Sequence, residues 1–415
     1  MNRPTTADIA AAATRLKGVL TETPLQLNAR LSERSGAEVY LKREDLSPVR
    51  SYKLRGAYNL ISQLGEAERA AGVICASAGN HGQGVAYSCA RLGIQGRVFV
   101  PSTTPRQKRD RMRQLGGEYV RLVVTGDTYD EAAQAAYEEA WETGAAMVPA
   151  FDDPRTIAGQ GTLAPEIVRQ LGGAPDVLVV PVGGGGMLAG CLTWMATHHP
   201  DTKVIAAEPA GAANLLASLK AGRPVPLETI DTFVDGAAVR QAGELTHAIA
   251  AEHDVEVVTV PEGQICSEML ELYQTDGVIA EPAGALAPAS LGIQVQLEPG
   301  MKVVAILSGG NNDVSRYNEI VERSLVHEGR KHYFLVNFPQ EPGALRRFLD
   351  EVLGPEDDIT LFEYVKRSNR ELGPALVGVE LGHPDDLAGL LQRMDRSPMT
   401  VDPVLPDSPF YRFLV

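Results

Sequence analysis

Residues 176–187 read DVLVVPVGGGGM, and this stretch decides the fold. An apolar strand leads into a glycine turn, and a helix is expected directly after it. As a linker the turn would be structureless, but between a buried strand and a helix its backbone N–H groups predict a phosphate cradle. The turn matches neither GxGxxG nor GxxxxGK(S/T), the usual motifs for binding a nicotinamide dinucleotide or ATP, so it does not favour either ligand. The cradle consists of Gly183, Gly184, Gly185, Gly186 and Met187.

From about residue 36 to residue 325, short apolar runs alternate with longer amphipathic ones. This alternation predicts an α/β body with parallel sheets covered by helices on both faces. Such sheets bind ligands beyond the carboxyl ends of their strands, where the glycine-rich segments fall. The length is enough for two lobes with a cleft between them. Strands are expected over 38–41, 73–76, 97–100, 119–124, 176–182, 203–208 and 302–307, and helices over 82–92, 105–115, 129–143 and 159–171.

Length and charge limit the class of protein. The 415 residues exceed one ordinary core, and 53 acidic against 38 basic side chains leave a net charge of −15. That charge disfavours nucleic acid and anionic membranes as partners, although one local set of amides can still bind an anionic cofactor. No apolar run is long enough to span a membrane, and the first twenty residues predict an amphipathic helix capped by Thr6 or Asp8, not a signal peptide. Four widely separated cysteines predict buried free thiols, no metal site and a cytoplasmic protein.

The pattern changes after Val326. Residues 332–352 predict a strand, a turn at Glu341–Gly343 and a helix, and further strands are expected over 358–366, 374–381 and 399–401, with a helix over 384–394. This βαββαβ order predicts a small ferredoxin-like unit. We therefore expect a catalytic domain over 1–326 and a separate domain over 327–415. One face of the first helix would carry Leu345, Phe348, Leu349 and Val352.

Three further segments carry candidate chemistry. Residues 51–56, SYKLRG, place Lys53 at the start of an expected helix; a lone lysine is usually solvated, but one that attacks an aldehyde needs burial that lowers its pKa. Residues 77–84, SAGNHGQG, form a strand-to-helix turn that is either a tight turn or an anion site for a substrate carboxylate. Residues 307–313, LSGGNND, end another strand in a similar turn.

The four motifs, in this order and spacing, resemble the fold-type II pyridoxal-phosphate enzymes, and among them the threonine dehydratases (threonine ammonia-lyases). The resemblance covers about residues 5–325; SYKLRG and PVGGGGM are highly specific, and the other two motifs are specific in combination. It implies a two-lobed body like that of the tryptophan synthase β chain and pyridoxal 5'-phosphate as cofactor. The C-terminal unit resembles the ACT-like regulatory domain of the biosynthetic short form.

The resemblance also implies roles for individual residues. Lys53 would carry the cofactor as a Schiff base and move protons, with Tyr52 beside the ring. Ser308 would face the ring nitrogen, where a neutral hydroxyl gives a weaker electron sink than an aspartate and suits β-elimination. Glu281 is a weaker candidate near the ring edge. Asn80 would bind the phenolic oxygen, the glycine cradle the phosphate, and the substrate carboxylate would lie against Ser77, Ala78, Gly79, Asn80 and His81.

The implied reaction is the conversion of L-threonine to 2-oxobutanoate and ammonia, the first committed step of isoleucine biosynthesis. A catabolic threonine or serine dehydratase is an alternative, although the unit after Val326 favours the biosynthetic form. Serine racemase shares these motifs, but it needs a proton-carrying serine where this chain has Ala78. Its divalent-metal site also looks incomplete, because Glu208 is present but Ala212 and Asn214 offer only one side-chain oxygen ligand between them.

The C-terminal unit implies feedback inhibition by isoleucine, with valine opposing it. An oligomerisation module and a catalytically dead amino-acid sensor are the other readings. A homotetramer or homodimer is expected in each case.

Overall fold

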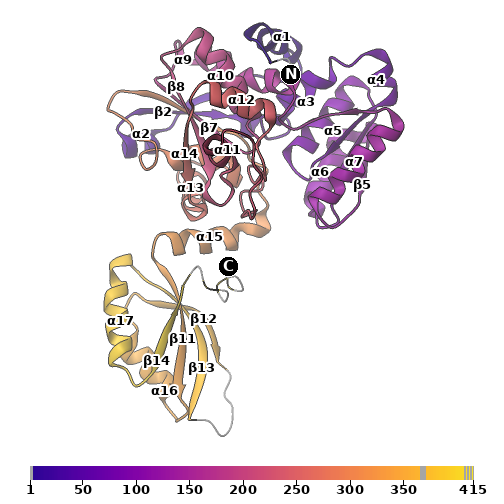
Figure 1. The fold of residues 1–415 in the computed structure, drawn as a ribbon. Helices are drawn as coiled ribbons and strands as arrows, with labels where there is room; N and C mark the ends of the chain where they lie inside the picture. Colours follow the sequence, from indigo (N-terminus) through magenta and orange to yellow (C-terminus); the bar gives the residue numbers. More distant parts are fainter. Residues whose placement is uncertain (1–2, 365–370, 406–407, 409–410, 412–413, 415) are drawn as a thin grey trace. The chain divides into compact units, whose positions relative to one another are not determined.

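The computed structural model describes residues 3–364, 371–405, 408, 411 and 414. The chain divides into two compact units, Met1–Asp313 and Val314–Val415 (Figure 1). Helix α15 (Tyr317–His327) falls in the second unit, whereas the sequence analysis assigns most of that stretch to the first domain. No helix among the described residues is long and apolar enough to cross a membrane. All four cysteines are free and buried.

The first unit is built on two sheets. The larger has the order β1-β2-β10-β7-β8-β9, with all pairs parallel except β1 with β2. The smaller has the order β5-β4-β3-β6 and is parallel throughout. The larger sheet consists of β1 (Leu25–Leu27), β2 (Glu38–Arg43), β7 (Val177–Pro181), β8 (Lys203–Pro209), β9 (Glu256–Val260) and β10 (Lys302–Leu307); the smaller of β3 (Val73–Ala76), β4 (Gly96–Val100), β5 (Val120–Val124) and β6 (Ala146–Met147).

Helices cover these sheets, as the alternating sequence predicts (Figure 1). Those not introduced elsewhere are α1 (Thr6–Leu16), α2 (Ala29–Ser35), α4 (Glu66–Ala71), α6 (Arg106–Gly116), α7 (Tyr129–Thr143), α11 (Asn214–Ala221), α12 (Glu244–Glu252) and α13 (Glu262–Gln274). The expected strands over 73–76 and 302–307 and the helix over 129–143 are confirmed residue for residue.

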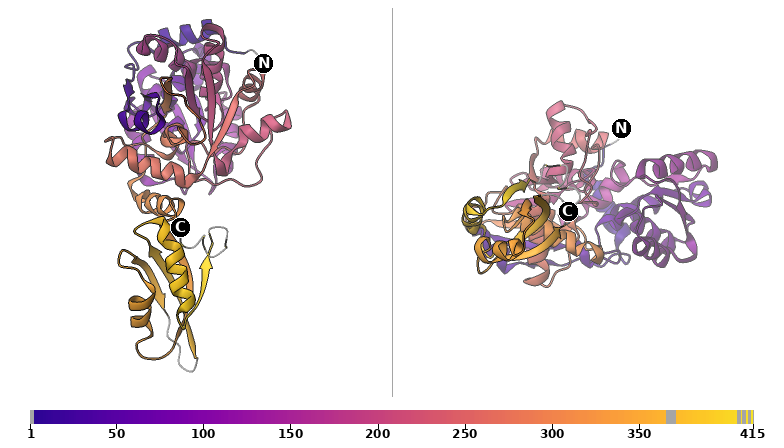
Figure 2. Two further views of the ribbon diagram at one scale, coloured as in Figure 1. Left: turned by 90° about the vertical axis from the view of Figure 1, so that its left-hand side faces the viewer. Right: turned by 90° about the horizontal axis from the view of Figure 1, so that it is seen from below.

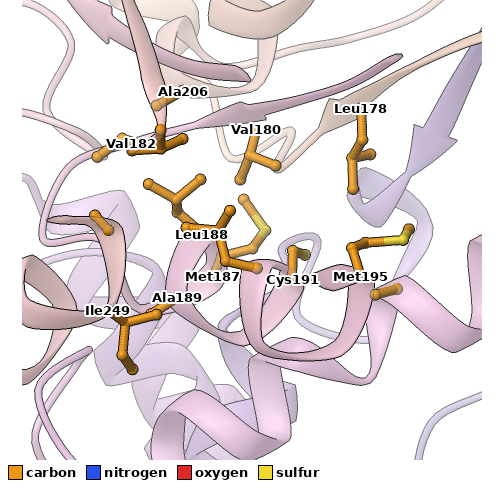
Figure 3. Close-up of a cluster of buried hydrophobic side chains, with 14 of the residues drawn as sticks. Leu178, Val180, Val182, Met187, Leu188, Ala189, Cys191, Met195, Ala206 and Ile249 are labelled. Carbon is orange, nitrogen blue, oxygen red and sulfur yellow. The ribbon is translucent and has the colours of Figure 1, made fainter. Parts of the chain in front are cut away.

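Helix α10 (Gly186–His198) shows how the core of the larger lobe forms. Its Leu188, Cys191 and Met195 point toward Leu178, Val180 and Val182 of the adjoining strand and loop (Figure 3). Side chains alternate along a strand, so the intervening residues of β7 point away from α10, and they are buried as well. The strand that leads into the glycine turn is therefore buried on both faces.

Two local predictions in the first unit are wrong. The N-cap of α1 is Thr5, whose hydroxyl accepts from the Asp8 N–H while the Asp8 carboxylate accepts in return, so neither Thr6 nor Asp8 is the cap. The single helix expected over 159–171 is two, α8 (Pro154–Gly161) and α9 (Leu163–Leu171). Pro165 lacks the N–H that would continue the first helix.

The second unit has the expected βαββαβ order, with an antiparallel sheet ordered β12-β13-β11-β14. Both helical segments pack on one face of this sheet (Figure 2). The strands are β11 (Lys331–Pro339), β12 (Asp358–Tyr364), β13 (Leu372–Glu380) and β14 (Thr400–Val404), and the helices α16 (Ala344–Arg347), which continues as a π turn over Phe348–Val352, and α17 (Leu387–Arg396). Residues 365 and 366, expected to end β12, lie outside the described residues.

The prediction that the first helix of this unit has a single apolar face is wrong. Phe348 and Val352 are buried, but the side chains of Leu345 and Leu349 are 43% and 44% exposed. The helix changes at Phe348 to a π turn, in which Leu353 N–H bonds the Phe348 carbonyl five residues back. This wider turn changes the angular spacing on which the prediction depends.

Candidate active site

Lys53 is the first residue of α3 (Lys53–Ile61), with Tyr52 as N-cap. Its side chain is half-buried, and the amine lies 3.3 Å from the carbonyl oxygen of Ala150 and 5.2 Å from the centre of the Tyr52 ring. Helix α3 packs against α8 and α5 (Asn80–Leu92), and Gly84 of α5 is so close that a Cβ there would lie 3.2 Å from the Lys53 backbone. The backbone that carries Lys53 is thus enclosed on two sides.

A buried ionic cluster fixes the same helix. Arg55 donates to Glu44 over 2.8 and 2.9 Å and to Glu166 over 2.9 Å, and Lys42 donates to Glu166 over 2.5 Å. Burial alone would lower the pKa of the Arg55 guanidinium, but Glu44 and Glu166 raise it above its usual value. Burial likewise opposes the charge of Glu166, yet Arg55 and Lys42 hold the pKa of that carboxyl below its usual range. Arg55 and Glu166 therefore keep their charges, and the pair anchors α3 two residues after Lys53.

The glycine turn forms the N-terminus of α10, with Gly185 as N-cap at φ +86°. The first N–H groups of a helix have no partner within it, so the amides of this turn point out as anion donors. Side chains pack against the turn: a Cβ at Gly184 would clash with the Phe151 ring, and one at Gly186 would lie 2.5 Å from Gln160 Oε1. Met187 takes part through its backbone only, because its side chain is buried in the core cluster around α10 (Figure 3).

Two side chains hold the carbonyl groups of the turn. Asn214 Nδ2 donates to the Gly183 oxygen over 3.0 Å, and the Thr246 hydroxyl donates to the Gly184 oxygen over 2.8 Å. Because these hydrogen bonds fix the orientation of the carbonyl groups, they also fix the direction of the N–H groups in the same peptide planes. Gln160 Oε1 and Asn214 Oδ1 are buried nearby without a protein partner. The fixed amides of the glycine turn fit a bound phosphate ester, whereas the two orphaned oxygens are acceptors and contribute no donor to it.

Ser308 directly follows β10, and its carbonyl accepts from the Tyr52 N–H over 3.1 Å. Its buried hydroxyl donates to the carbonyl of Ala283 in α14 (Pro282–Ser290) over 3.1 Å. A one-pair antiparallel bridge joins Ser51 to Gly309 beside it. The structure thus brings the segment after β10 against the segment that carries Lys53.

The turn over residues 77–84 runs from β3 into α5, which begins at Asn80 and not at residue 82 as expected. Ser77 Oγ accepts from the Gly79 N–H over 3.3 Å. His81 is buried, and one ring nitrogen lies 2.7 Å from the Val148 carbonyl, which can only accept. Burial and the Lys53 charge lower the pKa of His81 to about 4, so the ring is neutral near pH 7, with Nε2 protonated and Nδ1 without a protein partner.

Asn80 belongs to a ring of three residues with Glu281 and Asn311. Its Nδ2 lies 2.5 Å from Glu281 Oε1, and its Oδ1 accepts from Asn311 Nδ2 over 2.7 Å. Burial, followed by the charge of Asp235, raises the pKa of Glu281 to about 7 against the opposing effects of Asn80 and Lys108. Sequence reasoning gave Glu281 a minor role and missed Asn311, although Asn311 stands in the motif over residues 307–313.

The predicted residues come together through shared neighbours. Ala150 contacts the Lys53 amine, and the next residue, Phe151, covers the glycine turn. Ser308 contacts Tyr52, and Asn80 reaches the end of β10 through Asn311. Sequence reasoning missed Phe151, Gln160, Asn214 and Thr246, which no motif marks. Among the described residues, no group of three or more His, Cys, Asp or Glu side chains is placed to hold a metal ion.

Comparison with known families matches both units. The family described as "Pyridoxal-phosphate dependent enzyme" matches residues 16–309, and the "C-terminal regulatory domain of Threonine dehydratase" matches residues 322–414. The first match includes the glycine turn, Lys53 and Ser308. The fold-type II architecture expected from the motifs is confirmed.

Individual relatives agree with these families. The L-threonine dehydratase biosynthetic IlvA of Mycobacterium tuberculosis (strain ATCC 25618 / H37Rv) is 62% identical over 411 residues, covering 99% of this chain and 96% of the relative. The solved structure of the processed form of threonine deaminase isoform 2 from Solanum lycopersicum has a TM-score of 0.72 at 40% identity and covers 78% of this chain and 96% of its own. Maize serine racemase has the same TM-score at 26% identity, covering 79% of this chain and 99% of its own.

Proposed function

Because this chain belongs to the pyridoxal-phosphate dependent enzymes and, among them, to the biosynthetic L-threonine dehydratases, we propose that it converts L-threonine to 2-oxobutanoate and ammonia for isoleucine biosynthesis. One observation carries the assignment of the site. The Lys53 amine and the glycine turn lie against the consecutive residues Ala150 and Phe151, so an amine and a phosphate cradle share one pocket wall. A compound with both an aldehyde and a phosphate fits that pair of groups.

The cofactor supplies an electron sink that makes the α-proton of a bound amino acid acidic. Lys53 holds the cofactor through its amine, and once the amine is free it removes the α-proton. The β-hydroxyl then leaves as water. The enamine that is released takes up water and yields 2-oxobutanoate and ammonia, so the reaction consumes no net water.

The remaining site residues bind and orient. The amides of Gly183–Met187 hold the phosphate, with Tyr52 beside the ring. Ser308 offers a hydroxyl to the ring nitrogen and carries no charge that would keep that nitrogen protonated. Asn80 serves the phenolic oxygen, and the turn Ser77–His81 receives the substrate carboxylate. His81 is neutral near pH 7 and its Nε2 proton is used by the Val148 carbonyl, so the donors for the carboxylate are backbone N–H groups of the turn.

Racemisation is the less favoured activity. It requires an acid–base group on the face of the substrate opposite the lysine, and Ala78 has no proton to transfer. The likeness to maize serine racemase lies in the fold of the body. After incubation with L-serine, chiral chromatography should detect pyruvate but no D-serine.

The assignment of domains is also part of the proposal: residues 1–326 catalyse, and residues 327–415 bind an effector. The family matches to 16–309 and 322–414 support this division. We propose isoleucine as the inhibitor, with valine opposing it. Four buried free thiols support a cytoplasmic location, and we propose a homotetramer or homodimer with L-serine as a second substrate.

A pocket in the second unit supports an amino-acid effector. It has a volume of about 400 Å³ and lies beside the turn between β11 and α16. Leu345, Leu349 and Phe362 offer apolar contacts for a branched side chain. Arg346 offers a positive charge for a carboxylate, and Glu341, which pairs with Arg347, offers a negative charge for an ammonium group. Leu345 and Leu349 are the two leucines of the first helix of this unit that are exposed and do not pack in its core.

The test measures 2-oxo acid release from L-threonine and L-serine, with and without isoleucine, while the visible absorbance of the bound cofactor is recorded. Lys53→Ala should lose activity by about 10³-fold or more, because the residue that moves the proton is missing. It should also lose the absorbance of the lysine-bound cofactor. Lys203→Ala, at an exposed lysine on β8, is the control. A fully active Lys53→Ala protein would overturn the assignment.

A further inference from the structure

The three-residue ring around Asn80 fixes the direction of one side-chain amide. Asn311 Nδ2 donates to the Val49 carbonyl over 2.8 Å, and since a carbonyl only accepts, this atom is the nitrogen. The same nitrogen lies 2.7 Å from Asn80, so the Asn80 atom that faces it is the oxygen. The Asn80 nitrogen must therefore face Glu281, at 2.5 Å.

The hydrogen count of this ring leaves one free donor. The two hydrogens of Asn311 Nδ2 are used by Val49 and Asn80. Asn80 Nδ2 also has two hydrogens, and Glu281 accepts one of them. The backbone N–H of Asn311 donates to the same carboxyl group and closes the ring. The second hydrogen of Asn80 Nδ2 is the one that the ring does not use.

The surroundings hold Glu281 in place. Its side chain is buried, and its backbone N–H donates to the Gly309 carbonyl over 3.2 Å. A Cβ at position 309 would clash with Glu281 Oε1, so the carboxyl group occupies space that only glycine leaves free. The ring therefore joins the start of α14, the start of α5 and the turn after β10.

We propose that Asn311 and Glu281 are positioning residues that hold the Asn80 amide so that one of its N–H groups is available for the phenolic oxygen of the cofactor. The other N–H of Asn80 donates to Glu281, and the protonation state of Glu281 controls the strength of that hydrogen bond. The inference rests on the proposed function, since it assumes the cofactor. An ionised carboxylate accepts more strongly than a protonated one. The state of Glu281 thus changes the electron density at the amide that serves the cofactor.

The charged groups around Glu281 allow a test with opposite signs. Asp235 raises the pKa of Glu281, and Lys108, which pairs with Asp235 over 2.5 Å, lowers it. Arg50 and Asp45 lie against Gly310, the residue after Gly309. Asp235 and Lys108 are partly exposed, so they can be changed without opening the core.

The experiment follows the visible absorbance of the holoenzyme from about pH 6 to 9. The wild type should show a transition near pH 7. Glu281→Gln should remove it while the cofactor stays bound, because a glutamine oxygen still accepts from Asn80. Asp235→Asn should move the midpoint down and Lys108→Met should move it up. Glu208→Gln, at a buried carboxyl outside the ring whose pKa burial also raises to about 7, should leave it unchanged.

A second measurement tests Asn311. Asn311→Leu frees the Asn80 amide to turn over, so the dissociation constant of the cofactor should rise about three- to tenfold, the effect of one hydrogen bond. The inference is overturned if Glu281→Gln keeps the transition, or if the Asp235 and Lys108 variants fail to move it in opposite directions. If Glu281→Gln does not fold, the opposite shifts expected for Asp235→Asn and Lys108→Met still test the inference. A wild-type protein that binds the cofactor but releases no 2-oxobutanoate would instead refute the proposed function. The absorbance titrations of the wild type and the variants could still be measured in that case and would still test the role of Glu281.

Discussion

The ring of Phe151 lies so close to the backbone of Gly184 that a Cβ atom at position 184 would overlap it. The aromatic side chain thus forms one wall of the glycine turn, and Gly184 has no space for a methyl group.

Gly184→Ala should weaken cofactor binding by about tenfold or more, because the methyl group must displace either Phe151 or the turn whose amides hold the phosphate. Fluorescence titration of the apoenzyme with pyridoxal phosphate measures the effect. Gly173→Ala is a matched control, since that glycine has open space around it. Equal affinities for the two variants would exclude the turn as the phosphate site.

Arg55→Met should lower the free energy of unfolding by about 3–5 kcal/mol, because Glu44 and Glu166 would remain buried without their partner. Urea denaturation gives this value. Arg169→Met removes an ion pair with Glu22 in which both side chains are more than half exposed, and its effect should be small. If both variants lose the same stability, the buried cluster does not anchor α3.

Glu208→Gln should flatten the dependence of stability on pH. Burial raises the pKa of Glu208 to about 7 from an ordinary value of 4.5, so the folded protein holds this proton more tightly than the unfolded chain. The resulting stabilisation is complete below about pH 4.5 and is lost as the pH rises through about 7. Glutamine cannot titrate. Urea denaturation between about pH 5 and 8 should therefore show a smaller decline for the variant, with part of it remaining because Glu281 shifts in the same direction.

Leu349→Asn should weaken inhibition by isoleucine about tenfold while basal activity is kept, because an exposed side chain in the 400 Å³ pocket loses its apolar contact. Leu405→Asn changes a more exposed leucine of the same unit outside that pocket and is the control. Activity measured at increasing isoleucine concentrations gives the inhibition constants of both variants. A pocket variant that is inhibited as strongly as the wild type would place the effector elsewhere.

The sequence allowed good predictions where neighbours along the chain determine the structure. The apolar run before Gly183 and the glycines themselves define a strand, a turn and a helix start without any distant partner. The helix over 129–143 ends at Gly144 in the left-handed conformation, a stop that can be read directly from the sequence. The same local logic was wrong at Leu345 and Leu349, because a π turn interrupts the helical spacing.

Relations over long separations were not predictable. Glu281 and Asn311 lie 201 and 231 positions from Asn80, and Glu166 lies 111 positions from Arg55. A single sequence shows each of these side chains as an ordinary polar residue. Only the folded chain, in which the start of α14 and the turn after β10 meet the start of α5, brings them into contact.

Strand β10 lies between β2 and β7 in the larger sheet, although the chain reaches it only after residue 301. During synthesis the smaller sheet, whose strands all lie between residues 73 and 147, can assemble on the ribosome long before the larger one is complete. Until β10 inserts, β2 and β7 expose unpaired edges that invite aggregation. Ser308 follows that strand directly, so the larger sheet acquires its missing pair of strand contacts and the candidate pocket acquires one of its main elements in the same step.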